Sequence, residues 1–70
     1  MDREELMQAI RTGHIIIRMN DGREYAVDGV ETAMVTDLAA HVLYRSEKDN
    51  KYRAAILPLV TMSGVFPVEA

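Results

Sequence analysis

The two histidines, His14 and His41, are the side chains best suited to catalysis or metal binding in this cysteine-free chain. Nucleophilic catalysis needs a nucleophile beside a base, and neither Ser46 nor Ser63 lies in a recognisable nucleophile motif. A zinc site needs more converging ligands than Asp37 and His41 supply. The four glycines are isolated, so no phosphate-binding loop is expected. We therefore predict no catalytic residue, metal or cofactor. An enzyme or metal protein using His41 and Asp37 is the third alternative.

Basic and aromatic side chains flank a polar turn at residues 46–51. They are Arg45, Lys48, Lys51, Tyr52 and Arg53. Such a set is typical of single-stranded RNA binding, because cations attract the phosphate backbone and tyrosine stacks on bases. Glu47 and Asp49 lie in the same turn, however, and the formal net charge of the chain is −3. The charge balance favours the alternative of a solvated hairpin tip.

The longest uncharged stretch covers residues 54–68, although 27% of the whole chain is charged. It is interrupted by Pro58, Gly64 and Pro67, and is shorter than the roughly twenty apolar residues of a membrane-spanning helix. A barrel strand turns one face to the core and one to water, so a monomer would expose many of these apolar groups. The stretch is therefore predicted to serve as core and subunit interface. The predicted interface residues are Ile56, Leu57, Leu59, Val60, Met62, Val65 and Phe66.

Seventy residues form a single domain, residues 1–70, whose own core is only marginally sufficient. Without cysteine, disulfides and thiolate zinc sites are excluded, and oligomerisation is the remaining means of stabilisation. Residues 1–11 are acidic and have no apolar run, so they do not predict a signal peptide. We expect a soluble, cytoplasmic homo-oligomer with no membrane partner.

Residues 2–12 are predicted to form one short helix. Asp2 can act as the N-cap, and Glu5 follows at the spacing of a capping box. Gly13 supplies the residue type that commonly ends helices. A single apolar face is formed by Leu6, Met7 and Ile10. A helix this short must pack on something to be stable.

Residues 14–20 change to strand character and end at the hairpin signal Asn-Asp-Gly. A three-residue loop ending at Gly22 sets Arg18 across from Glu24 as an opposite-charge pair. A two-residue turn would instead set Ile15, Ile17 and Met19 opposite Asp28, Ala26 and Glu24. We therefore predict the three-residue loop. It builds one apolar face from Ile15, Ile17, Met19, Tyr25 and Val27.

The remaining chain predicts three more strands. Residues 30–40 either continue a bent second strand or form a turn with one helical twist. Strands follow at residues 42–44, 52–57 and 59–66, with Pro58 as an interruption and Gly64 as a bulge, before a tail at residues 67–70. One helix and five short strands predict a mainly β domain, with a closed or nearly closed barrel over residues 14–66.

Residues 17–25, Ile-Arg-Met-Asn-Asp-Gly-Arg-Glu-Tyr, resemble the start of the first Sm motif, and residues 56–65 resemble the second Sm motif of the Hfq branch. The order of elements is similar over nearly the whole chain. The resemblance implies a five-stranded Sm-like (SH3-like) barrel that assembles in rings, the fourth strand of one subunit pairing with the fifth of its neighbour. This chain has Val27 where the family usually has glycine. It lacks the Lys-His pair of Hfq and a clear match to the uracil-pocket Asp and Asn.

Two functions are compatible with these features. The first is a self-assembling Sm-like barrel that acts by binding, with single-stranded RNA as the candidate ligand. The second is an SH3-like assembly module without a nucleic-acid role, in which the apolar stretch at residues 54–68 contacts a partner protein. Neither requires catalysis.

Overall fold

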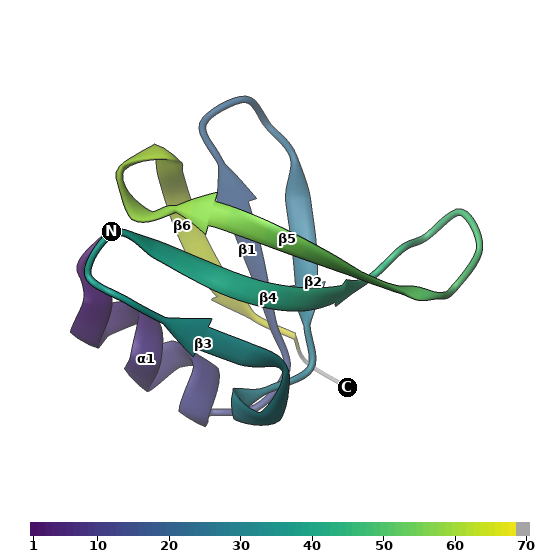
Figure 1. Cartoon of the computed structure of the whole chain (residues 1–70), viewed down its shortest axis with the longest axis horizontal. Coiled ribbons are helices and arrows are strands. Elements are labelled where there is room, and N and C mark those ends of the chain that lie inside the picture. The colour runs from purple at the N-terminus through teal and green to yellow at the C-terminus, as the bar shows by residue number, and fades with distance from the viewer. Residues whose placement is uncertain (69–70) are drawn as a thin grey trace.

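The computed structural model describes residues 1–68 of the chain. Over these residues one α-helix precedes a six-stranded antiparallel sheet (Figure 1). The elements are α1 (Arg3–Arg11), β1 (Ile15–Met19), β2 (Glu24–Val27), β3 (Ala33–Val35), β4 (Ala39–Arg45), β5 (Tyr52–Pro58) and β6 (Met62–Pro67). Two short 3-10 turns, η1 (Val30–Thr32) and η2 (Leu59–Thr61), precede β3 and β6. The mainly β fold with one N-terminal helix is as predicted.

Helix α1 packs its apolar face against β3 and β6. Leu6 and Ile10 are buried, and Gly13 has a φ of +118°, as its predicted role in ending the helix requires. The predicted capping box is wrong, because the Asp2 side chain makes no capping hydrogen bond. Instead the ammonium group of Met1 donates to the carbonyl of Leu59 at 3.1 Å, which fixes the chain at the start of the helix.

The hairpin of β1 and β2 has the predicted register. Ile15 pairs with Val27 and Ile17 with Tyr25, and Arg18 lies across from Glu24. The Arg18 Nη2 atom is 2.8 Å from the Glu24 carboxylate, so the predicted charge pair forms. Gly22 ends the three-residue loop with a φ of +90°, which a side chain would disfavour. Local pairing rules were sufficient to predict this part of the fold.

The segment for which two alternatives were left open, residues 30–40, contains η1, the short strand β3, a turn and the first two residues of β4. After β2 the chain passes through Gly29 and η1 and then forms β3, and both β2 and β3 pair with the same strand, β4. Strand β2 meets β4 at one register position, Val27 opposite Tyr44. The alternative of one bent strand corresponds to two strands in the structure, β2 and β3, which explains six strands in place of five.

The C-terminal segment differs from the prediction at both ends. Residues 59–61 form the 3-10 turn η2, so the last strand begins at Met62 instead of Leu59. It also extends through Pro67, and the amide of Val68 donates to the carbonyl of His14 at 2.9 Å, so the predicted tail starts too early. Residues 69–70 lie outside the described chain. The predicted bulge is present, because the pairing of β6 with β1 shifts between Arg18–Gly64 and Met19–Met62.

The sheet curls into a half-barrel around one core. In Figure 1, β4 and β5 cross in front of β6, β1 and β2, while β3 lies below β4 and next to α1. The core lies between these two groups of strands and under the helix; it consists of Leu6, Ile10, Ile15, Ile17, Met19, Val27, Ala40, Val42, Leu57, Leu59 and Met62. Within residues 1–68 no strand covers the outer edge of β5 or of β6, so the barrel does not close.

Candidate interaction surface

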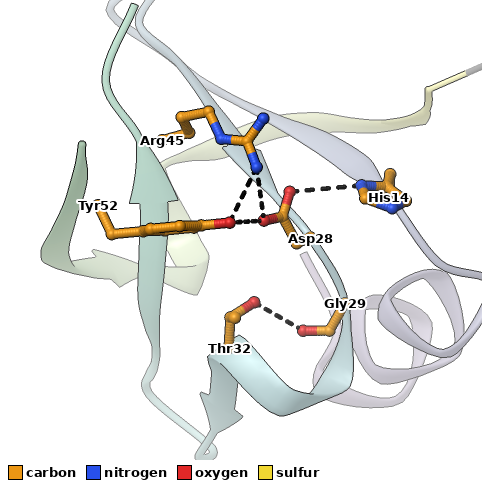
Figure 2. A network of polar contacts seen from close by, with 6 residues as sticks. All are labelled: His14, Asp28, Gly29, Thr32, Arg45 and Tyr52. Carbon is orange, nitrogen blue, oxygen red and sulfur yellow. Dashed lines mark hydrogen bonds and ion pairs between the residues drawn. The ribbon is translucent and has the colours of Figure 1, made fainter. Parts of the chain in front are cut away.

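Two of the predicted RNA-binding residues, Arg45 and Tyr52, lie where β4 and β5 join the hairpin loop, and both bind the same carboxylate. Figure 2 shows Asp28, just after β2, between these residues and His14. The Tyr52 hydroxyl donates to Oδ2 of Asp28, and Arg45 Nη2 donates to the Tyr52 oxygen at 2.9 Å. Nδ1 of His14 lies 3.3 Å from the other oxygen of Asp28. We call these four residues the Asp28 cluster.

The Asp28 cluster stabilises the ionised carboxylate. The hydrogen bond from Tyr52 is the main cause that lowers the pKa of Asp28; Arg45 and His14 act in the same direction, and partial burial opposes them. The pKa of Arg45 is raised by its hydrogen bond with Tyr52 and by the charge of Asp28. The charge of Arg45 is therefore already balanced within the molecule.

The third predicted cation, Arg53, is also paired. Its Nη2 atom lies 2.6 Å from the carboxylate of Asp49 in the loop of the same hairpin. The backbone amide of Lys51 is the main cause that lowers the pKa of Asp49, and Arg53 adds to it. Lys48 and Lys51 form no ion pair with any residue that the structure describes. RNA binding at this hairpin stays a prediction, with two lysines as its main cations.

The residues of the third alternative, His41 and Asp37, are not drawn together by the fold into a ligand set. Asp37 pairs with Arg3 of α1 at 2.9 Å, and His41 lies on the outer face of β4, opposite Met34 of β3 and Ile56 of β5. In residues 1–68 no three His, Cys, Asp or Glu side chains form a group suited to a metal ion.

The seven predicted interface residues divide between the core and the surface. Leu57, Leu59 and Met62 are buried in the core, so they cannot contact a second subunit. These three side chains point inward, beneath α1 and between the two halves of the sheet, so they supply the core part of the predicted stretch and do not form an interface. Val65 is half-buried, packed against the core. Exposed apolar surface remains at Ile56, Val60 and Phe66.

Phe66 has partners within its own subunit. Its ring covers Gly64, where an added β-carbon would come within 3.0 Å of the ring. Arg18 stacks on the ring with its guanidinium carbon 4.9 Å from the centroid. A glycine covered by a neighbouring aromatic ring is a recurrent device in sheets. One of the apolar side chains predicted to be exposed in this segment, Phe66, is therefore partly packed against residues of its own subunit on the outer face of β6.

The outer edges of β5 and β6 are long and almost uncharged. Strand β5 has seven residues and β6 has six, and Arg53 is the one charged residue in the two strands. Natural edge strands are commonly protected by lysines, by shortness or by a covering segment. Apart from the bulge in β6 and terminal prolines, these edges have little such protection. They can accept a further strand.

A second exposed surface, which was not predicted from the sequence, is the outer face of β3, β4 and β5. Because side chains alternate along strands, residues facing away from the core meet across these strands. Five of them form what we call the apolar face: Met34, His41, Leu43, Ala54 and Ile56. Buried and exposed positions alternate from Ala39 to Arg45, but apolar residues occupy both sets, so no alternating pattern in the sequence marks this face.

No helix in the described part of the chain has the length and apolar character needed to cross a membrane. Comparisons of the chain with protein-family models, with curated proteins and with solved structures found no match.

Proposed function

We propose that this protein is a non-catalytic assembly module in which the β5 edge of one copy pairs with the β6 edge of the next, as the Sm resemblance implies. The observation that carries the proposal is the presence of two open strand edges, β5 and β6, on one half-barrel. A strand edge exposes unpaired backbone donors and acceptors, and a second strand satisfies them. Pairing of two different edges is heterologous, so repeated contacts build a ring or a filament.

The side chains beside these edges support the proposal. Ile56 points outward from β5, and Phe66 points outward from β6. When β5 and β6 of two copies continue one sheet, their outward side chains lie on the same face of that sheet. The exposed part of Ile56, 66% of the residue, can then be covered by the neighbouring copy. The association combines backbone hydrogen bonds with apolar burial.

The solution mass tests the assembly. We expect a defined oligomer by light scattering at micromolar concentration, and we expect Ile56→Lys to reduce the mass because it places a charge beside the paired edge. Val30→Lys is the matched control, since Val30 is equally exposed but lies on η1, away from both edges. A monomeric wild-type protein would exclude the proposal.

Cysteine cross-linking tests which edges pair, and the absence of native cysteine makes it specific. We expect an Ile56→Cys preparation mixed with a Phe66→Cys preparation to form disulfide-linked pairs. Neither variant alone is expected to cross-link. Cross-linking of Ile56→Cys alone would indicate a two-fold β5–β5 contact instead, and would contradict heterologous pairing.

Single-stranded RNA is the ligand that the hairpin residues suggest for such an assembly. Lys48 and Lys51 are the cations that support it, and a ring would multiply their number. Because Arg45 and Arg53 are paired with carboxylates, the support from charge is smaller than the five predicted residues indicated.

A further inference from the structure

The hydrogen bonds at the two ends of the β4–β5 ladder show which backbone groups point to the open edge of β5. In an antiparallel ladder, hydrogen-bonded residue pairs alternate with pairs whose N–H and C=O groups point away from each other. The amide of Ser46 donates to the carbonyl of Lys51 at 2.9 Å, and the amide of Leu59 donates to the carbonyl of Leu38 at 3.0 Å. Both bonds lie in register with the strands between them and give the same alternation. The residues of β5 that point to the open edge are therefore Tyr52, Ala54, Ile56 and Pro58.

The open edge of β6 has fewer groups to offer. The amide of Val68 donates to the carbonyl of His14 at 2.9 Å, so Pro67, which precedes it, belongs to a pair that points away from β1. Val65, two residues earlier, has the same orientation, and the bulge at Gly64 interrupts the alternation before it. Between the bulge and the end of β6, the edge therefore presents the amide and the carbonyl of Val65 and the carbonyl of Pro67.

Both prolines of the chain lie at positions that point to an open edge. Proline has no N–H, so at such a position it leaves the ladder to its inner neighbour complete, but it cannot donate to a strand that is added outside. Pro58 ends the row of donors on β5, and Pro67 ends the row on β6. The two prolines therefore limit the registers in which the edges can pair.

The donors that β5 must supply follow from this limit. The two outward carbonyls of β6 are acceptors two residues apart, and they need two N–H donors with the same spacing on β5 of the next copy. Pro58 cannot donate, so the donors are either Tyr52 and Ala54 or Ala54 and Ile56. The second choice also brings the side chain of Ile56, which is 66% exposed, against the neighbouring copy. Ala54 donates in both.

We infer that the backbone amides of Ala54 and Ile56 join β5 of one copy to β6 of the next, and that Pro58 and Pro67 set the ends of this shared ladder. The inference rests on the proposed assembly and adds its register and the residues that determine it. The amide of Val65 donates in the opposite direction. Because β6 presents so few outward groups, the ladder is short, and the loss of one donor removes a large share of its hydrogen bonds.

The adjacent residues Ala54 and Ala55 provide a matched pair of variants, because their amides point to opposite sides of β5. Ala54→Pro removes a donor from the open edge, whereas Ala55→Pro removes a hydrogen bond to Val42 of β4. We expect Ala54→Pro to reduce the solution mass to that of a monomer, with a melting temperature in dilute protein close to that of the wild type. Ala55→Pro should lower this melting temperature. An equal loss of thermal stability in both variants, or an oligomer mass unchanged by Ala54→Pro, would overturn the inference.

The variant Pro67→Ala tests the other end of the ladder by adding a donor. One further neutral hydrogen bond corresponds to about a five-fold change in affinity. We expect the dissociation constant between copies, measured by light scattering over a dilution series, to fall by about this factor. Val68→Ala is the matched control, because the amide of Val68 already donates to His14; it should change the constant less than about two-fold. A constant that Pro67→Ala leaves unchanged would contradict the role of Pro67.

Amide hydrogen exchange of the wild type and of Ile56→Lys gives a measurement that needs no proline substitution. The amides of Ala54 and Val65 should exchange slowly in the oligomer and rapidly in the dissociated variant, while that of Ala55 is protected by β4 in both. Rapid exchange of Ala54 in a wild-type oligomer would overturn the inference and leave self-association standing. A monomeric wild type would exclude the proposed assembly and the inference with it, so the two failures are distinguishable.

Discussion

At Asp28 one carboxylate joins three parts of the half-barrel. His14 comes from the connection between α1 and β1, Asp28 follows β2, and Arg45 and Tyr52 belong to the β4–β5 hairpin. Nearby, the hydroxyl of Thr32 donates to the carbonyl of Gly29 at 2.9 Å and closes the turn that bends the chain (Figure 2). These contacts hold the bend between β2 and β3 against the hairpin.

Substitution Asp28→Asn is expected to lower the free energy of unfolding by roughly 1 kcal/mol at pH 7, because charge-assisted hydrogen bonds are replaced by weaker ones at a partly exposed site. The pKa of Asp28 is lower in the folded state than the value of about 3.9 in the unfolded chain. The stabilisation is therefore complete above the unfolded pKa and is lost as pH falls through the folded pKa.

Urea unfolding of both proteins at pH 7 and at successively lower pH measures this effect. The difference in unfolding free energy should shrink as the wild-type carboxylate becomes protonated. A difference that stays constant into the acid range would show that the charge of Asp28 is not its origin.

In strand β5, two adjacent residues differ sharply in exposure. Leu57 is 4% exposed and Ile56 is 66% exposed, because they point to opposite faces of the strand. We expect Leu57→Ala to cost about 2–5 kcal/mol of unfolding free energy, since it opens a cavity in the core. Ile56→Ala should cost less than about 0.5 kcal/mol in dilute protein. Equal losses in denaturant melts would contradict the inward and outward faces assigned to β5.

The β4–β5 hairpin is the element that tests RNA binding. With Lys48 and Lys51 as its main cations, binding of a short U-rich RNA should weaken with salt at a log–log slope of only about −1.4 per copy, from roughly −0.7 for each phosphate contact. Replacing both lysines by alanine should abolish it, while Arg11→Ala on α1 should not. If the protein binds no RNA at low salt in a fluorescence titration, the RNA function is excluded.

Elements whose structure depends on residues close together in the sequence could be predicted. Elements whose structure depends on how the sheet bends could not. The β1–β2 register follows from alternation around Asn20, Asp21 and Gly22, and it was correct residue by residue. Residues 59–61 have strand-forming composition, yet they turn in a 3-10 helix because Leu59 must enter the core directly after Pro58. The Asp28 cluster depends on β2 lying beside β4, which no periodicity of the sequence reveals.

The part of the chain that the structure describes is a half-barrel of about 30 × 24 × 18 Å in which the outer edges of β5 and β6 pair with no strand. A chain of this size gains only a modest core, so association should add measurably to its stability. We expect the apparent melting temperature to rise with protein concentration, because an assembly that binds only the folded state stabilises it by mass action. In Ile56→Lys the melting temperature should not change with concentration. Calorimetry over a hundred-fold concentration range would show which behaviour holds.

The meeting of β2 and β4 at one register position, Val27 opposite Tyr44, leaves two three-stranded groups joined by a narrow seam. Within each group the strands pair over several consecutive residues. The Asp28 cluster links the two groups next to this junction. Cooperative opening units often coincide with such supersecondary groups. Amide hydrogens of β1, β2 and β6 should therefore exchange with solvent as one unit, and those of β3, β4 and β5 as another. Because the Asp28 cluster links the two groups, Asp28→Asn should increase the difference in hydrogen-exchange protection between them.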